Sequence, residues 1–206
     1  MHMHLKSLVV ACSLIIAACP VARSADLNFT VQQVGIDVVT TVNGFVVTAA
    51  LTNFGASQWA GGMWLSNTNG SILINGPATS SSNNVNVYRG GIVGGQRFGA
   101  GALISASSGS GNFVGITSNT NSSLLLPFGY VSGSPITSSS IYTNKTISGL
   151  GLTLGTYNWS WGSGATAGTA QMTISNVPEP GTYALGAIAT AVLAAVARRK
   201  RNQKTA

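Results

Sequence analysis

Short runs of β-branched and aromatic residues, each ended within a few positions by Gly, Asn, Ser or Pro, make up the sequence between Asp26 and Val177. No stretch of this region repeats apolar residues at the three- and four-residue spacing of an amphipathic helix. Several stretches instead alternate apolar with polar residues, as half-buried strands do. Gly, Ser, Thr and Asn supply 87 of the 206 residues, a composition that favours many turns between short elements. The sequence therefore predicts an all-β fold, an antiparallel β-sandwich-like domain over residues 25–176.

The strongest turn signal in this region is Asn43-Gly44. It predicts a hairpin between residues 35–42 and 45–52, because Asn-Gly between β-branched runs favours a type I′ turn. Before it, residues 27–32 alternate apolar with polar side chains and predict a separate strand. Shorter strands are expected at residues 62–66, 71–75, 84–89, 112–117 and 123–126, and mobile loops at 79–83 and 105–111.

Three aromatic residues near the end of the domain, Tyr157, Trp159 and Trp161, alternate with small polar residues. Residues 170–174 alternate in the same way after a loop at 162–168, so a second hairpin is predicted here. One buried face of a sheet produces such an alternation, and we therefore expect the three rings in the core.

Ionic side chains are concentrated at the two ends of the chain. Between Asp26 and Val177 the sequence holds three basic residues, Arg89, Arg97 and Lys145, and two acidic ones, Asp26 and Asp37, for a net charge of +1. A nucleic-acid-binding protein needs a basic face, so no nucleic-acid partner is expected. Both histidines and both cysteines lie within the first 19 residues. The sequence thus predicts no catalytic residue, no metal-ligand set and no cofactor, and the protein is not expected to be an enzyme.

Residues 1–24 have the features of a secretory signal peptide. Lys6 precedes an apolar run at residues 8–18, and small residues lead to a cleavage site after Ser24. The 11 residues of this run form roughly 16 Å of helix, too short to span a hydrocarbon core of about 30 Å. An alternative is a lipoprotein signal, because residues 16–19 resemble a lipobox in which Cys19 is lipidated; Pro20, directly after it, argues against this.

Residues 177–206 contain three consecutive parts. The first, at 177–180, includes Pro178, Glu179 and Pro180, whose two prolines fix φ twice and keep the peptide extended, a form that suits a protease groove. An apolar run follows at 183–197 and predicts a transmembrane helix of roughly 22 Å, short enough to be a transient span. The third part is a basic cluster at 198–201, Arg198, Arg199, Lys200 and Arg201, which should stay in the cytoplasm and leave the first part outside. A permanent single-pass anchor is the alternative.

This tail resembles the PEP-CTERM sorting domain of Gram-negative bacteria. The resemblance implies an exosortase-type membrane enzyme as partner, with Pro178, Glu179 and Pro180 as its recognition element. It also implies a transient intermediate in the inner membrane and delivery to the cell envelope or the extracellular, biofilm-type matrix. Residues 155–165 are similar to a segment that many such proteins carry upstream of the tail.

The resemblance to this sorting class implies a structural or adhesive role for the exported, nearly neutral β-domain. An alternative is a carbohydrate-binding module for exopolysaccharide. In that case Trp59, Trp64 and Tyr88 would stack on sugar rings while neighbouring amides and hydroxyls bind the sugar hydroxyls. A secreted hydrolase is a distant alternative, because glycoside hydrolysis needs two facing carboxylates and the domain has only Asp26 and Asp37 to supply them.

We expect the mature protein to lack both termini. Mass spectrometry of the protein isolated from its own cells should find a new N-terminus at Ala25 and no peptide from residues 198–206. An intact basic cluster in the mature protein contradicts C-terminal processing, and a lipid on Cys19 contradicts the signal-peptide prediction.

Overall fold

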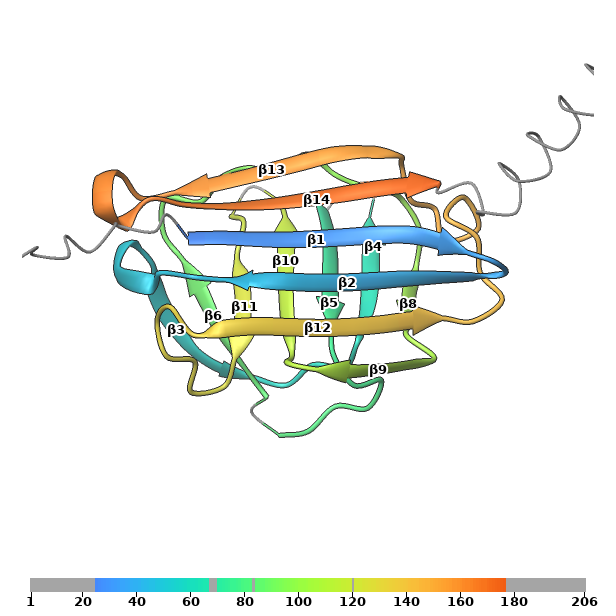
Figure 1. Cartoon of the computed structure of the whole chain (residues 1–206), viewed down its shortest axis with the longest axis horizontal. Helices are drawn as coiled ribbons and strands as arrows, with labels where there is room; N and C mark the ends of the chain where they lie inside the picture. The colour runs from blue at the N-terminus through green and yellow to red at the C-terminus, as the bar shows by residue number, and fades with distance from the viewer. Residues whose placement is uncertain (1–24, 67–69, 83, 120, 177–206) are drawn as a thin grey trace, which may run out of the picture.

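The computed structural model describes residues 25–66, 70–82, 84–119 and 121–176. These residues form two seven-stranded β-sheets with two short 3₁₀ turns, Thr48–Ala50 and Gly164–Thr166, and no α-helix among them. In Figure 1 the strands of the front sheet run along the long axis, and those of the rear sheet run across them, as in an orthogonally packed sandwich. The predicted all-β fold of two facing sheets is confirmed. The prediction that the strands are antiparallel is wrong at one pair, because residues 25–33 pair in parallel with residues 168–176.

The front sheet has the strand order β7-β13-β14-β1-β2-β12-β9. Its strands are β1 (Ala25–Val34), β2 (Asp37–Phe45), β7 (Val93–Gly94), β9 (Ser108–Gly111), β12 (Pro135–Tyr142), β13 (Gly155–Trp161) and β14 (Gly168–Asn176). β1 pairs with β14 in parallel, and the other neighbours pair antiparallel. The first and last strands of the described domain therefore lie side by side at the centre of the sheet.

The rear sheet has the strand order β3-β6-β11-β10-β5-β4-β8. Its strands are β3 (Thr52–Ser57), β4 (Gly62–Ser66), β5 (Gly70–Asn75), β6 (Val85–Arg89), β8 (Leu103–Ser105), β10 (Val114–Ser118) and β11 (Leu124–Pro127). Two hairpins, β4–β5 and β10–β11, meet at its centre through the antiparallel β5–β10 pair. Strands were predicted at each of the five short runs of the sequence, and all five lie in this sheet.

The hairpin predicted around Asn43-Gly44 is wrong. The turn lies at Gly35-Ile36, between β1 and β2, where Val34 pairs with Asp37. Gly35 has φ +59° and no positive φ is found at Ile36, the pattern of a type II′ turn. Gly44 lies inside β2, where its φ is +134° and an added Cβ would collide with the backbone carbonyl of Asp26. The glycine thus permits a close approach between strands and does not form a turn.

The second predicted hairpin is confirmed as β13 and β14, with residues 162–167 as its loop. The predicted strand at residues 27–32 is confirmed as part of β1. The mobile loop expected at residues 105–111 is wrong, because Ser108–Gly111 forms the edge strand β9 and Ser105 ends β8. These small polar residues pair with β12 through their backbones, so an apolar side chain is not needed there.

The inner faces of the two sheets enclose one apolar core. Along β1, Leu27, Phe29 and Val31 are buried in this core. The three aromatic rings of β13 belong to the same core, as predicted. The largest fully buried side chains are Trp159, Trp161, Tyr142, Phe29, Phe98, Leu27, Met63, Leu65, Leu73, Ile116, Leu124 and Leu126. Burial of each aromatic side chain in this set removes about 150–250 Å² of surface from water. The burial of these large side chains therefore dominates the stabilisation of the folded domain.

A few buried polar groups connect the sheets at one side of this core. The Thr40 hydroxyl on β2 donates to Asn75 Oδ1 at the end of β5, at 3.0 Å. The Ser140 hydroxyl on β12 accepts from the backbone N–H of Gly76 and donates to its carbonyl, both at 3.1 Å. These hydrogen bonds satisfy backbone and side-chain groups that would otherwise be buried unpaired, and they fix the offset between the sheets.

We expect Tyr142→Phe to preserve or raise stability. Burial raises the pKa of the Tyr142 hydroxyl well above its usual range, and this oxygen has no hydrogen-bond partner within the described part of the chain. Loss of an unsatisfied buried hydroxyl should raise the free energy of unfolding at pH 7 by up to about 1 kcal/mol. A drop of that size in urea denaturation contradicts this expectation.

The same variant should be less sensitive to alkali. A folded-state pKa raised above the unfolded value means that stability is constant below the unfolded pKa, near 10, and falls as the pH rises above it. Burial also raises the pKa of Tyr130 and of Tyr157, so some alkaline loss should remain in Tyr142→Phe. Melting temperatures measured from pH 7 to pH 11.5 check this.

Candidate functional site

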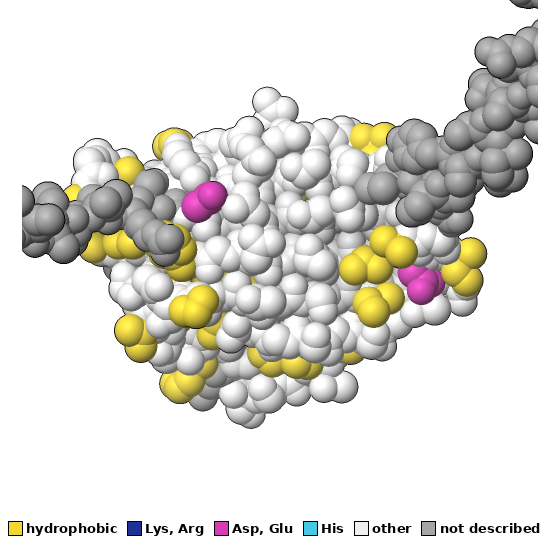
Figure 2. Space-filling view, viewed as in Figure 1, with side chains coloured by type: hydrophobic (Ala, Val, Ile, Leu, Met, Phe, Trp, Pro, Cys, Tyr) yellow, Lys and Arg dark blue, Asp and Glu magenta, His cyan; other side chains and the backbone are white. Residues whose placement is uncertain are grey.

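The two carboxylates of the described domain lie at opposite ends of the front sheet. Asp37 pairs with Val34, eight residues along β1 from Asp26, which separates the two by roughly 27 Å. Glycosidase pairs are about 5–9.5 Å apart, so Asp26 and Asp37 do not form one. Figure 2 shows the two acidic patches at either end of a face that is otherwise covered by uncharged side chains.

Each of these carboxylates has a structural hydrogen-bond partner. Asp37 Oδ1 accepts from the backbone N–H of Asn144 at 2.8 Å, and Asn144 has φ +53°. Asp26 accepts from the Asn28 amide at 3.2 Å and from the Thr169 hydroxyl at 3.4 Å. Within the described ranges no three His, Cys, Asp or Glu residues are grouped as a metal site would require.

The rear sheet is apolar on its outer face as well as on its inner face. A second cluster of apolar side chains lies outside the sheet, separate from the main core. Its members on the strands are Ile72 and Ile74 on β5, Val85 and Val87 on β6, and Leu125 on β11. The signal for this is present in the sequence, because uninterrupted apolar runs at 72–74 and 124–126 are typical of strands covered on both sides.

Trp59 covers part of this outer face. The ring packs on the outer apolar cluster from the loop between β3 and β4. The loop is held by Asn84, whose Oδ1 accepts from the Trp59 N–H at 2.9 Å and whose amide donates to the Trp59 carbonyl. Gly115, which has no side chain, lies between Ile74 and Leu125 in the row of residues beneath the cluster. The indole is therefore placed by a fixed loop over a shallow apolar floor.

A cleft of about 290 Å³ opens on one side of Trp59. Trp64 on β4 lies between Ile72 on β5 and Leu103 on β8 in the strand pairing, and all three line this cleft. Both tryptophans are half-buried, so each offers part of its ring to solvent. The polar lining consists of Gln58, Ser80 and Ser105, and no lining residue is charged.

A second cleft, of about 390 Å³, opens on the other side of Trp59. It is lined by amides and hydroxyls along with Ile72, Val87 and Leu125. Its polar residues are Ser57, Arg89, Thr117, Asn119, Asn121 and Ser123. Arg89 donates from Nε to the Ser123 hydroxyl at 3.0 Å and lies 5.0 Å from the centre of the Phe54 ring. Trp59 thus separates an uncharged cleft from one that has more polar residues and Arg89 in its lining.

The structure brings together two of the three aromatic residues predicted to stack on glycans. Trp59 and Trp64 line one cleft, as just described. Tyr88 does not join them: it points into the core from the inner face of β6 and is only 8% exposed, so its prediction as a stacking residue is wrong. Successive side chains of β6 point to opposite faces of the sheet, so Tyr88 points inward where Val87 points outward. The sequence alone did not show which of the two faces the core.

The arrangement around Trp59 can bind an uncharged, ring-shaped ligand. Aromatic faces pack on the apolar side of such a ring, and the amide and hydroxyl groups at the rim bind its polar edge. A volume of about 290 Å³ is near the lower end of the range, about 300–1,000 Å³, that small-ligand pockets occupy. The lining of this cleft, as the structure describes it, holds no charged or imidazole side chain that could act as a base beside Ser80 or Ser105.

Several predicted features lie outside the described residues. These are the signal peptide at 1–24, Cys19, the motif Pro178, Glu179 and Pro180, the apolar run at 183–197, and the basic residues Arg198, Arg199, Lys200 and Arg201. In the part of the chain that the structure describes, no helix has the length and hydropathy to cross a membrane.

Comparison with known families identifies the tail. The model of the PEP-CTERM protein-sorting motif matches residues 176–201, which include all three parts of the tail up to the basic cluster. No curated protein and no solved structure matches the chain. The family match thus begins at Asn176, the last residue of β14, and otherwise covers the segment that follows the domain.

We expect Asn84→Ala to release the Trp59 loop. The substitution leaves the N–H and carbonyl of Trp59 without their side-chain partner, which should cost about 1–3 kcal/mol of unfolding free energy. In a Trp64→Phe background, Trp59 is the half-buried tryptophan that remains of the two at the cleft. Its fluorescence emission should shift to longer wavelength as the released loop exposes the indole to water. Asn43→Ala, which removes an exposed amide from the front sheet, is the control. Equal spectra for the two variants contradict the role given to Asn84.

Proposed function

We propose that this chain, which carries a PEP-CTERM motif and is exported and sorted by an exosortase, is an adhesive protein that binds neutral exopolysaccharide through the cleft between Trp59 and Trp64. The single observation that carries the proposal is the placement of these two half-buried indoles on one uncharged cleft. In this proposal the protein is delivered to the cell envelope or extracellular matrix of a Gram-negative bacterium, where such polymers are abundant.

The lining of the cleft supports a sugar as ligand in preference to a charged molecule. Pyranose rings have apolar faces that pack on indole and equatorial hydroxyls that pair with amides and hydroxyls. Ile72 and Leu103 extend the apolar floor, and Gln58 and Ser80, which are hydrogen-bonded to each other at 3.3 Å, lie at the rim. An acidic ligand would lose its hydration in this cleft without gaining a cation.

The loop that carries Trp59 supports the same conclusion, because it is fixed before a ligand arrives. Gly61 donates to the Pro77 carbonyl at 2.9 Å and accepts from the Ala106 N–H at 2.9 Å, in addition to the contacts of Trp59 with Asn84. A preorganised site pays less conformational entropy on binding. The second cleft, beyond Trp59, offers a continuation of the polymer track along Thr117 and Ser123.

We expect Trp64→Ala to weaken binding of the mature protein to neutral exopolysaccharide from the producing cells by about 30-fold, since buried aromatic anchors contribute about 2 kcal/mol or more. The measurement is titration with the polymer followed by tryptophan fluorescence. Trp159 and Trp161 are buried in the core, so a spectral change on binding reports on Trp59 and Trp64.

Phe128→Ala is the matched control, because Phe128 is an aromatic residue that is 60% exposed and lines neither cleft. It should bind the polymer as the unmodified protein does. No retention of the unmodified protein on the polymer, or equal losses in the two variants, removes the glycan-binding role and leaves a purely structural one.

A further inference from the structure

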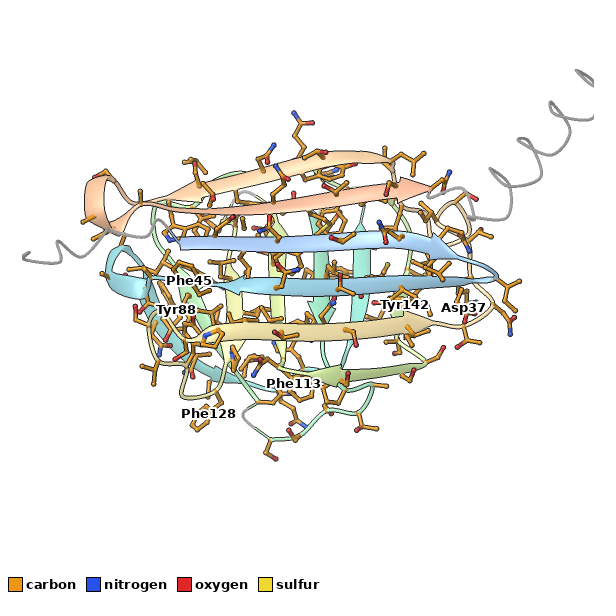
Figure 3. The ribbon with its side chains drawn as sticks, viewed as in Figure 1. Asp37, Phe45, Tyr88, Phe113, Phe128 and Tyr142 are labelled. Carbon is orange, nitrogen blue, oxygen red and sulfur yellow. The ribbon has the colours of Figure 1, made fainter. Side chains whose placement is uncertain are left out.

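The end of the sandwich at which β14 stops carries an exposed apolar surface. Ile36, in the β1–β2 turn, is 70% exposed, Val34 is 54% exposed and Leu154, before β13, is 52% exposed. We call this surface, formed by Val34, Ile36 and Leu154, the exit rim. In Figure 2 apolar side chains gather at this end of the front face, beside an acidic patch; Figure 3 labels Asp37 there.

The exit rim lies beside the last residue of β14. Asn176 pairs with Gln33 on β1, and the turn with Ile36 follows three residues after Gln33. A groove of about 620 Å³ is lined by Asn176 together with Ile36, Leu154 and residues of the 144–148 loop. β14 therefore ends at a groove that has exposed apolar side chains in its lining, and the sorting tail follows in the sequence.

The groove is held in one conformation by Gln33. Its amide nitrogen donates to the carbonyls of Gly35, Asp37 and Lys145 at 3.0–3.1 Å, and its Oε1 accepts from the Ile147 N–H at 3.0 Å. This one side chain ties the β1–β2 turn to the loop that follows β12. The exit rim is thus prepared for contact, at little entropic cost to a partner.

The position of the sorting motif determines what must contact this rim. Pro178 is two residues beyond Asn176 and Pro180 is four, so even a fully extended chain places them no more than about 7 Å and 14 Å from the end of β14. An enzyme that holds residues 178–180 in its cleft cannot be kept away from the domain by a linker of this length. Its surface must meet the exit rim.

We propose that the exit rim is a docking surface for the exosortase-type membrane enzyme that processes this chain. Interfaces are anchored by apolar side chains at their centre with polar groups at the border. Ile36, Val34 and Leu154 form such a centre, with Asp37 and Lys145 as the charged groups nearby. Docking adds binding energy to a short recognition motif and selects the folded domain for processing. The inference depends on the sorting motif and not on glycan binding.

The test is processing of the full-length precursor in the producing cells. Ile36→Asp and Leu154→Asp should each slow conversion of precursor to mature protein at least about fivefold, because an interface anchor is replaced by a charge. Val131→Asp, at a side chain that is 68% exposed in the loop before β12, at the opposite end of the sandwich, is the matched control and should leave the rate unchanged. Thermal melts of the mature proteins verify that all three variants fold.

A second measurement separates docking from a general defect in export or folding. A 12-residue Gly-Ser insert between Asn176 and Val177 spans about 19 Å on average, so the enzyme can reach the motif without touching the exit rim. With this insert, Ile36→Asp and the unmodified domain should be processed at the same rate. An Ile36→Asp defect that persists with the insert overturns the proposal, as does unchanged processing of both rim variants without it.

A photo-crosslinker at position 36 identifies the occupant. In cells it should give an adduct with the processing enzyme, and the same crosslinker at position 131 should not. An adduct with lipid only means that the exit rim rests on the membrane surface, and this outcome also overturns the proposal.

Discussion

The mutual burial of two sheet faces is the interaction on which the domain depends. The described domain has few ionic side chains and no cysteine, so neither charge networks nor disulfides can hold it together. The rings of Phe29, Trp159 and Trp161 are buried in the core between the two sheets, whose strands cross (Figure 1). Thr40 and Ser140 add directional hydrogen bonds at the side of this core, which limits how far the sheets can slide. Every surface feature discussed above is positioned by that packing.

The rear sheet shows how a surplus of apolar residues creates a site. A sheet that covers one core needs one apolar face, yet β5 and β11 are apolar on both. Trp59 covers part of the outer face at the expense of an indole nitrogen that has no partner within the described ranges. The part that Trp59 leaves open, from Ile72 to Leu103, is the floor of the cleft. On the outer face of the front sheet, by contrast, the middle is covered mainly by uncharged polar side chains such as Thr30, Thr41 and Gln171, and apolar side chains gather toward its ends (Figure 2).

The sequence predicted the parts of the fold that depend on local pattern. Alternation identified β1, β13 and β14, and the tail motif was visible from its order of prolines, apolar run and basic cluster. The hairpin at Asn43-Gly44 was wrong because a glycine with positive φ serves a close contact between strands as readily as a turn, and only the partner strand distinguishes the two. β9 was missed because backbone pairing with β12 needs no side-chain signal. Trp59 and Trp64 line the same cleft because of the path of the loop between β3 and β4, and no local sequence pattern predicts that path.

The attachment point of the tail has a mechanical consequence for the domain. β14 is paired with β1 and β13 along most of its nine residues, and the tail continues from its last residue, Asn176. A load applied through Asn176 acts along β14, perpendicular to the antiparallel hydrogen bonds with β13 and across the slanted parallel hydrogen bonds with β1. Both ladders are therefore loaded in shear, and many bonds resist together. An edge strand such as β9, pulled away from its neighbour in the direction of the hydrogen bonds, would instead lose those bonds one at a time. The parallel pairing of the first and last strands, which places β14 at the centre of the front sheet, thus supports both presentation of the sorting motif and resistance to force at the place where the tail begins.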